Sequence, residues 1–161
     1  VDAMAPGLAR FVGAERRFQR RGNARGVTVV DDYAHHPTEV AATLAAAREA
    51  YPDRRIVVAF QTHLFSRTRD YAMEFGQALA AADVLCLAEI YPAREQPIPG
   101  VTSALIADAA MRAGRAPAWT GPRDAMADAL ADLVREGDVV LTVGAGDVTQ
   151  TGPELLARLG A

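Results

Sequence analysis

The chain has 161 residues, 50% of them hydrophobic and 23% charged, which is typical of a globular domain with a sizeable core. The net charge of −3 leaves no basic excess to neutralise phosphates, so nothing favours a nucleic-acid partner. No apolar run reaches the length of a membrane span and no signal peptide opens the chain, so we expect no membrane partner either. The single cysteine, Cys86, lies in an apolar run and is expected to be buried and inert, which fits a reducing, cytoplasmic setting.

All 17 basic residues are arginine, which we attribute to genomic base composition. The chemical consequence is that the chain cannot supply a P-loop lysine, a Schiff-base lysine or a lysine general base. If the protein takes part in ATP chemistry, the phosphate cradle must come from elsewhere.

Strands and helices are predicted to alternate along the chain. Residues 16–21 and the apolar strand from Val27 are expected to form a hairpin around Gly22-Asn23, which places an antiparallel strand at a sheet edge. Further strands are predicted at 56–60, 84–90, 118–119 and 139–143, with helices at about 38–51, 71–79, 105–114, 122–133 and 153–159. The pattern indicates an α/β fold: one domain over residues 1–161 with a doubly wound, mostly parallel, Rossmann-like sheet and an antiparallel edge strand.

The run from Asp31 to Glu39 places two carboxylates, a phenol and two imidazoles between a buried strand and a helix that Pro37 opens. In open α/β sheets, ligands bind outside the carboxyl ends of the strands. Turn formation or helix capping would explain one or two of these polar residues, but not all of them. The run therefore predicts a ligand site.

Asp31 and Asp32 end the strand, and we expect one to bind a ribose and the other to serve the local structure. His35 and His36 could combine with Asp31 and His63 in a metal site. Adjacent histidines rarely ligate one ion well, and no further ligands follow at a recognised spacing, so we predict no metal site. A histidine that hydrogen-bonds a carboxylate or phosphate is the favoured interpretation.

Residues 61–68 follow the next apolar strand and should border the first cluster. Arg67 lies near a helix start, where backbone amides already favour an anion, and arginine binds carboxylates or phosphates with two prongs. Pairing with Asp70 at the surface is the alternative, and it suits Arg69 better. We therefore assign His63 and Arg67 to the site.

Two further segments carry weaker signals. Arg16-Arg17 could clamp a phosphate or simply decorate an edge strand, and spacing alone does not decide between these. Gly144-Ala145-Gly146-Asp147 is half of a dinucleotide fingerprint, but it follows the last strand and lacks the third glycine. We interpret it as a tight turn at the rim of the site.

The sequence resembles the C-terminal domain of the Mur ligases over nearly its whole length. The matching motifs keep the family's order and are Arg16-Arg17-Phe18, Asp31 to Glu39, Phe60 to Thr68, Tyr91-Pro92-Ala93-Arg94-Glu95 and Gly144-Ala145-Gly146-Asp147. The second and third motifs resemble the alanine-adding members and the related ligase that recycles murein tripeptide, and the third is closer to the former. Thr62 stands where the family usually has proline, and Leu64 where some members have a substrate-binding arginine.

The resemblance implies a three-domain, ADP-forming ligase that joins L-alanine to UDP-N-acetylmuramate. Its N-terminal domain would hold the UDP-sugar, and its central domain would carry the P-loop and the Mg²⁺ ligands. This chain would close over ATP and the amino acid as the third domain. ATP would phosphorylate the lactyl carboxylate, and the amine of L-alanine would attack the acyl phosphate.

The resemblance also implies roles for individual residues. Nucleotide contacts are expected from Arg16 near the phosphates, Asp31 at the ribose, and Asp32 and Tyr33. Substrate contacts are expected from His35, His63 and Arg67, with His35 and Arg67 as the catalytic pair because charge develops there.

One alternative of another class remains, a self-contained metal-dependent phosphoesterase that uses Asp31, Asp32, His35 and His63. On the ligase interpretation, the chain should fold alone but catalyse nothing alone, because it has no lysine, no P-loop and no full set of metal ligands.

Overall fold

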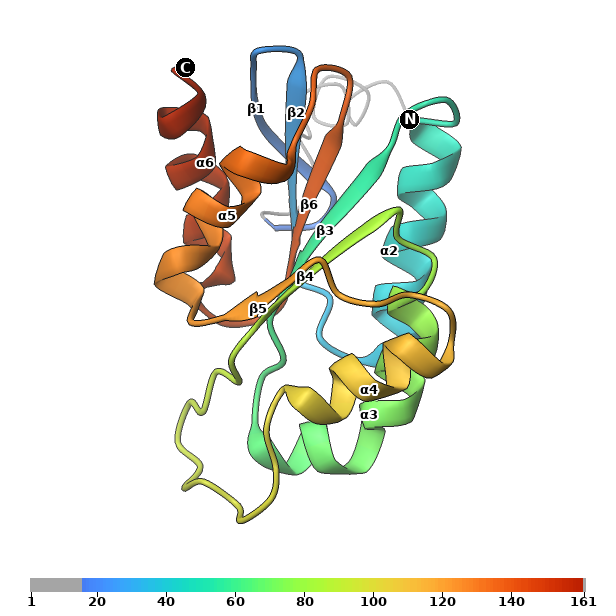
Figure 1. Ribbon diagram of the computed structural model, residues 1–161, viewed down its shortest axis with the longest axis vertical. Coiled ribbons are helices and arrows are strands. Elements are labelled where there is room, and N and C mark those ends of the chain that lie inside the picture. Colours follow the sequence, from blue (N-terminus) through green and yellow to red (C-terminus); the bar gives the residue numbers. More distant parts are fainter. Residues whose placement is uncertain (1–15, 161) are drawn as a thin grey trace, which may run out of the picture.

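The computed structural model describes residues 16–160, which form one sheet with helices on both faces (Figure 1). The strands are β1 (Gln19–Ala24), β2 (Val27–Asp32), β3 (Ile56–Phe60), β4 (Val84–Ala88), β5 (Trp119–Gly121) and β6 (Val139–Val143). The helices are α2 (Pro37–Ala50), α3 (Phe65–Leu79), α4 (Ala104–Arg112), α5 (Met126–Leu133) and α6 (Thr151–Leu159), with 3-10 turns η1 (Arg123–Ala125) and η2 (Asp147–Gln150).

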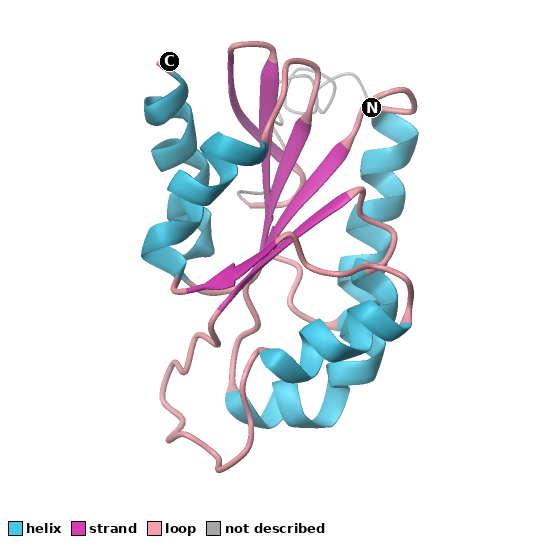
Figure 2. Cartoon of the chain, viewed as in Figure 1, coloured by secondary structure: helices cyan, strands magenta, loops and turns pink. Residues whose placement is uncertain are grey.

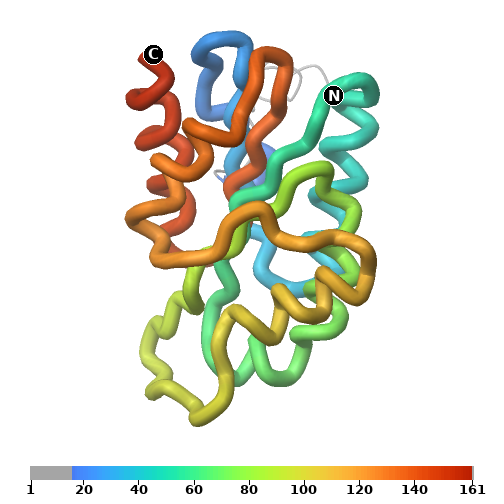
Figure 3. The backbone as a smooth tube through the Cα atoms, viewed as in Figure 1, coloured from blue at the N-terminus to red at the C-terminus, as the bar shows by residue number. Residues whose placement is uncertain are grey.

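The strand order is β1-β2-β6-β3-β4-β5. Strand β1 pairs antiparallel with β2, and all other pairs are parallel, so the predicted fold class is confirmed. The last strand of the chain, β6, lies between β2 and β3, as the orange trace between the blue and green strands shows (Figure 3).

Helices α2, α3 and α4 cover one face of the sheet, and α5 and α6 cover the other (Figure 2). Each face has its own apolar core, and β3 and β6 are buried along their whole length because they contribute to both. This is why their sequences are continuous apolar runs instead of alternating patterns. Cys86 belongs to one of these cores, and burial raises the pKa of its thiol to about 12, as expected for an inert cysteine.

The predicted turn of the first hairpin was wrong. Gly22 lies within β1, where the register with β2 shifts, and the chain turns at Arg25 and Gly26, whose φ angles are 49° and 75°. Gly22 is small for a different reason, since a Cβ there would lie 2.8 Å from Cδ1 of Leu156 in α6. The glycine therefore serves helix–sheet packing, and the sequence signal was assigned to the wrong cause.

Other boundaries differ by a few residues. The strand predicted to reach residue 90 ends at Ala88, and the helix predicted from Pro122 begins with the 3-10 turn η1 before α5 starts at Met126. The last helix is preceded by η2, which continues the chain from Gly146. None of the helices within residues 16–160 combines the length and apolar character needed to cross a membrane.

Helices α3 and α4 approach each other very closely at Gly76. A Cβ atom at this position would lie 2.4 Å from the Cβ of Ala109 and 2.6 Å from the backbone nitrogen of Ala110. Helix α3 also departs from helical geometry at Tyr71, where φ is −125°. The close contact fixes α3, whose first turn carries Arg67, against the rest of this layer.

Candidate functional site

The segments that follow β2, β6, β3 and β4 meet at one end of the sheet, because these strands are parallel neighbours. They carry the four motifs singled out downstream of Arg16-Arg17-Phe18. The long connection after β4, yellow in Figure 1, extends beyond this end of the sheet. Residues predicted from separate stretches of sequence are thus brought to one edge.

Asp31 is fully buried and hydrogen-bonded on both carboxylate oxygens. Its Oδ2 accepts from Nε of Arg16 (3.1 Å) and from the hydroxyl of Thr149 (2.9 Å), and its Oδ1 accepts from the hydroxyl of Thr142 (2.7 Å). Arg16 also donates through Nη2 to the carbonyl of Gly144 (2.6 Å). Asp31 therefore fixes the guanidinium of Arg16 at the end of the sheet.

Asp32 holds the chain on either side of it. Its Oδ2 accepts from the backbone amide of Phe18 and its Oδ1 from that of Ala34, both at 2.8 Å. We expected one of the two aspartates to serve structure, but both carboxylates are bonded to protein donors. The ribose contact predicted for Asp31 stays a prediction, and it requires a carboxylate oxygen to exchange one of these donors for the ligand.

Tyr33 is the exposed aromatic residue of this motif, with 41% of its residue surface accessible. The guanidinium carbon of Arg16 lies 4.9 Å from the centroid of its ring, within the range of a cation–π contact. A hollow of about 350 Å³ adjoins Tyr33 and is also lined by Arg17, Phe18 and His35. A cation, an aromatic face and open volume thus coincide beside the predicted nucleotide-binding residues.

The two histidines diverge, as adjacent residues in a turn should. The His35 ring faces Tyr33 (5.1 Å between centroids) and His63 (6.5 Å). The His36 ring instead contacts Tyr71 of α3 at 5.0 Å and caps α2 by accepting from a backbone amide. His35 therefore lies beside Tyr33 and His63 in the candidate site, and His36 serves the helix start.

Glu39 completes the cap of α2. Its Oε2 accepts from the backbone amides of His35 (2.9 Å) and His36 (3.1 Å). These bonds, the one from His35 above all, hold the pKa of Glu39 below its ordinary value. The carboxylate at the end of the Asp31 to Glu39 run is therefore a capping group that fixes the histidine turn.

His63 and Arg67 lie at the start of α3. The His63 ring stacks on Tyr91 with 5.7 Å between centroids and 18° between planes. Burial lowers the pKa of His63, the neighbouring Arg67 and His35 lower it further, and Glu95 opposes them with a smaller effect, so the neutral imidazole is favoured near pH 7. Within residues 16–160, Nδ1 of His63 and Nη1 of Arg67 are buried without a hydrogen-bond partner. The Nη1 group of Arg67 can donate a hydrogen bond to an anion, and a neutral His63 imidazole can accept one from an amine.

Tyr91 belongs to one of the matching motifs, but the sequence predicts no role for it. It pairs with His63 in a parallel bridge, with its backbone amide donating to the Thr62 carbonyl (2.8 Å) and its own carbonyl accepting from Leu64 (2.9 Å). No signal in the sequence shows that the segments after β3 and β4 continue to pair beyond the sheet.

The Gly144-Ala145-Gly146 segment forms the predicted turn at the rim. A Cβ at Gly144 would lie 2.6 Å from the carbonyl oxygen of Gln61, and one at Gly146 would lie 2.6 Å from Cγ of Tyr91. The glycines are therefore required by the close approach of neighbouring loops. The carbonyl groups of both glycines accept hydrogen bonds from Arg16. This segment therefore presents acceptors that bind a cation, not the amide donors that would bind a phosphate.

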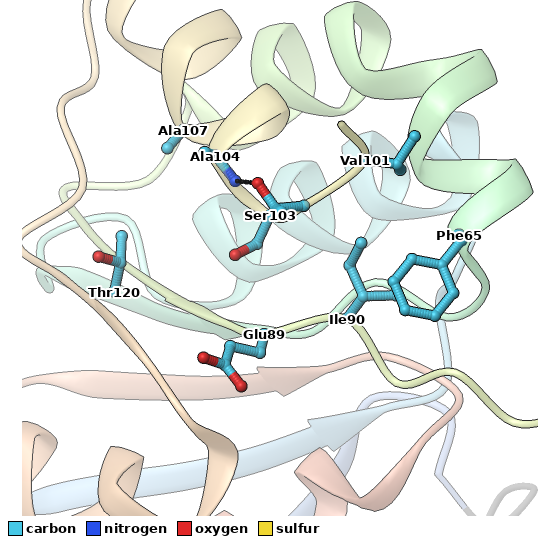
Figure 4. Close-up of a pocket in the computed structure, with 9 residues that line it drawn as sticks. Phe65, Glu89, Ile90, Val101, Ser103, Ala104, Ala107 and Thr120 are labelled. Carbon is cyan, nitrogen blue, oxygen red and sulfur yellow. Dashed lines mark hydrogen bonds between the residues drawn. The ribbon is translucent and has the colours of Figure 1, made fainter. Parts of the chain in front are cut away.

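A second hollow of about 350 Å³ lies at the ends of β4 and β5 (Figure 4). Phe65, Ile90 and Val101 give it an apolar wall, and Glu89 and Ser103 add polar groups. Among residues 16–160, no three His, Cys, Asp or Glu side chains gather closely enough to hold a metal ion.

Comparison with known proteins identifies the family. The family model described as Mur ligase, glutamate ligase domain, matches residues 16–146. The chain is 58% identical over 158 residues to UDP-N-acetylmuramate–L-alanine ligase of Kineococcus radiotolerans and 54% identical over 156 residues to that of Streptomyces coelicolor. These matches cover 98% and 97% of the chain but 33% and 34% of the relatives, so the chain spans about a third of their length.

Solved structures agree. A UDP-N-acetylmuramate–alanine ligase from Thermotoga maritima superposes with a TM-score of 0.77 at 28% identity, covering 96% of this chain and 33% of that one. A murein peptide ligase from Psychrobacter arcticus, at 23% identity, 96% and 32% coverage and a TM-score of 0.74, shares the fold. On the family match, the curated relatives and these superpositions together, the chain belongs to the Mur ligase family.

Proposed function

We propose that this chain is the C-terminal domain of an ATP-dependent, ADP-forming ligase that joins L-alanine to UDP-N-acetylmuramate in peptidoglycan synthesis. The observation that carries the proposal is the identity of 58% with an alanine-adding ligase over 98% of the chain. The partners would be the N-terminal and central domains of the same protein, in the cytoplasm, and all of residues 1–161 would belong to this third domain.

ATP would supply the phosphate that activates the carboxylate, and Mg²⁺ would be held by the central domain. The described residues fit the nucleotide, since Arg16 and Tyr33 offer a cation and an accessible aromatic face beside a hollow. Residues 16–160 contain no cluster of three His, Cys, Asp or Glu side chains, and we assign the Mg²⁺ ligands to the central domain. Because the chain contains no lysine, the P-loop lysine would also belong to the central domain.

At the other end of the site, Arg67 would bind the carboxylate of L-alanine or the acyl phosphate with its unpartnered guanidinium nitrogen. His63, neutral near pH 7, would accept a hydrogen bond from the amine. His35, whose ring faces both His63 and Tyr33, would lie between the amino acid and the nucleotide. Cationic donors fixed before the reaction stabilise the negative charge that develops on the attacked carbonyl.

The two alternatives have less support. A self-contained metal-dependent phosphoesterase would need ligands gathered from Asp31, Asp32, His35 and His63, but Asp31 is fully buried and both aspartates are bonded to protein donors. A murein-tripeptide ligase shares the fold at 23% identity, far below the 58% shared with an alanine-adding relative.

The isolated chain is expected to unfold cooperatively on heating, because apolar cores cover both faces of its sheet. It should release no phosphate from ATP in the presence of Mg²⁺, UDP-N-acetylmuramate and L-alanine, whereas the full-length protein should release one phosphate for each alanine joined. A phosphate assay measures the release, and mass spectrometry measures the alanine-containing product. Steady release by the chain alone, abolished by a chelator, would establish the phosphoesterase instead.

Replacing Arg16 by methionine in the full-length ligase should raise the KM for ATP roughly tenfold, the effect of one lost charged hydrogen bond. Arg20→Met on the exposed part of β1 is the matched control and should leave the KM unchanged. Asp31→Asn then separates two roles in a double-mutant cycle with Arg16→Met. If Asp31 acts through Arg16, the double variant is no worse than Arg16→Met, and if Asp31 binds the ribose directly, the effects add. An unchanged KM in Arg16→Met would remove Arg16 from the nucleotide site.

A further inference from the structure

Two connections of the chain are joined beyond the end of the sheet, and the structure gives this junction a closing contact. The segments after β3 and β4 first pair through the backbone, where Tyr91 donates to Thr62 and accepts from Leu64. Four residues further on, Glu95 reaches back to the first turn of α3. Its Oε2 accepts from the backbone amide of Ser66 (2.9 Å) and its Oε1 from the Ser66 hydroxyl.

The first turn of α3 needs such a contact. Leu64, the residue that precedes the helix, makes no side-chain cap, and its φ of 78° is a left-handed conformation that leucine rarely adopts. No acidic residue lies in the first turn of α3 itself. Glu95 supplies the missing acceptor and negative charge from 29 residues away. The bonds from Ser66 hold the pKa of Glu95 below its ordinary value, so the carboxylate is ionised near neutral pH.

Ser66 lies between the two side chains on which the amino-acid end of the site depends. His63 precedes the turn and stacks on Tyr91, and Arg67 follows Ser66 directly. Both carry buried nitrogens without a partner in the described part of the chain, so neither is fixed by a hydrogen bond at those atoms. Their separation is set by the backbone of this turn, and Glu95 bonds Ser66 of the turn to the opposite connection, beyond the backbone pairing at Tyr91.

We propose that Glu95 is a positioning residue, which fixes the first turn of α3 through Ser66 and thereby holds Arg67 and His63 at the separation that binds the amino-acid substrate. The proposal rests on the proposed function for the identity of that substrate. An ordinary helix cap is the competing explanation, and it would affect stability without affecting substrate binding.

The kinetic test uses the full-length ligase. Glu95→Ala and Ser66→Ala should each raise the KM for L-alanine roughly tenfold and leave the KM for ATP within twofold, since a mispositioned binding group loses about one charged contact. Ser66→Thr keeps the hydroxyl and should restore the parent value. The double variant should be no worse than either single variant, because both remove the same contact. Gln96→Ala, at the exposed neighbour of Glu95, is the matched control. A lower melting temperature with unchanged KM values would show an ordinary cap and overturn the proposal.

A second measurement does not depend on the reaction. In the 161-residue chain, the pKa of His63 is followed by NMR in Ser66→Ala, which removes the contact without changing charge. Burial is the main cause that lowers the pKa of His63, Arg67 lowers it further, and Glu95 has a smaller opposing effect. Loosening the turn exposes the ring and moves Arg67 away, so it should raise that pKa toward its ordinary value. An unchanged His63 pKa would overturn the proposal even if the ligase proves inactive with L-alanine. If the pKa of His63 rises but the ligase does not use L-alanine, the positioning role of Glu95 is supported and only the proposed substrate is rejected.

Discussion

Replacing Arg67 by alanine should lower kcat/KM for L-alanine by two to three orders of magnitude in the full-length ligase, or about 3–4 kcal/mol of transition-state stabilisation. The guanidinium is partly buried at the start of α3, and its Nη1 has no partner within residues 16–160. Because no group in the described chain accepts a hydrogen bond from this nitrogen, removing it should change the stability of the fold little. A bound anion would lose a charged hydrogen bond. Stopped-time product assays at saturating ATP measure the loss.

The matched control is Arg69→Ala, two residues along the same helix. Arg69 is exposed and pairs with Asp70 at 2.7 Å, so its loss should leave kcat/KM within twofold. Arg67→Lys should recover only part of the rate, since an ammonium group cannot reproduce a two-pronged contact. In the isolated chain, Arg67→Ala should also raise the pKa of His63, because one of the charges that lower it is gone. Near-parent turnover by a folded Arg67→Ala ligase would remove Arg67 from the site.

Replacing Asp138 by alanine should destabilise the isolated chain by about 3 kcal/mol, because it leaves a partly buried arginine without its counter-charge. Asp138 precedes β6, and its side chain is 4% exposed. It accepts from Nε (3.0 Å) and Nη2 (2.7 Å) of Arg55 and from the backbone amide of Arg135 (2.8 Å). The expected fall in melting temperature is roughly 6–12 °C for a chain of this size, measured by circular dichroism or calorimetry.

The chain contains its own control for this prediction. Arg69 and Asp70 form the same type of ion pair at the same distance of 2.7 Å, but their side chains are 54% and 50% exposed. Asp70→Ala should therefore leave the melting temperature nearly unchanged. Comparable falls in the melting temperatures of Asp138→Ala and Asp70→Ala would show that burial does not determine how much these ion pairs stabilise the chain.

The fold was largely predictable because its strands are apolar runs separated by helices with clear spacing. Strands β3 and β6 match the predicted ranges residue for residue, since a strand buried on both faces leaves an unambiguous pattern. The hairpin itself was predicted, but the position of its turn was not predictable, because Gly22 is small to accommodate Leu156, a residue near the other end of the described chain. The residues around a glycine do not indicate which distant helix will pack against it.

The residues assigned to the candidate site meet at one end of the sheet, as their positions after the strands predicted, and their roles stay predictions. Position along a strand was enough to bring His35 near His63, since parallel neighbours end at the same edge. The hydrogen bonds of Asp31 and the pairing of Tyr91 with the segment after β3 could not be read from the sequence. The first depends on Thr142 of β6 lying beside β2, and the second on two connections pairing outside the sheet.

The central place of β6 bears on how the protein is made. Until Val139–Val143 has left the ribosome, β1 and β2 have no bonded link to β3, β4 and β5, because β6 is the strand that joins the two groups. The two fragments would each expose an unpaired strand edge during synthesis, a state open to aggregation. Completion of the sheet must wait for nearly the whole chain, and the final strand then inserts by contacts distant in sequence, which favours slow folding. A nascent chain stopped before residue 139 should therefore remain protease-sensitive, and release of the last strand should confer resistance in one step.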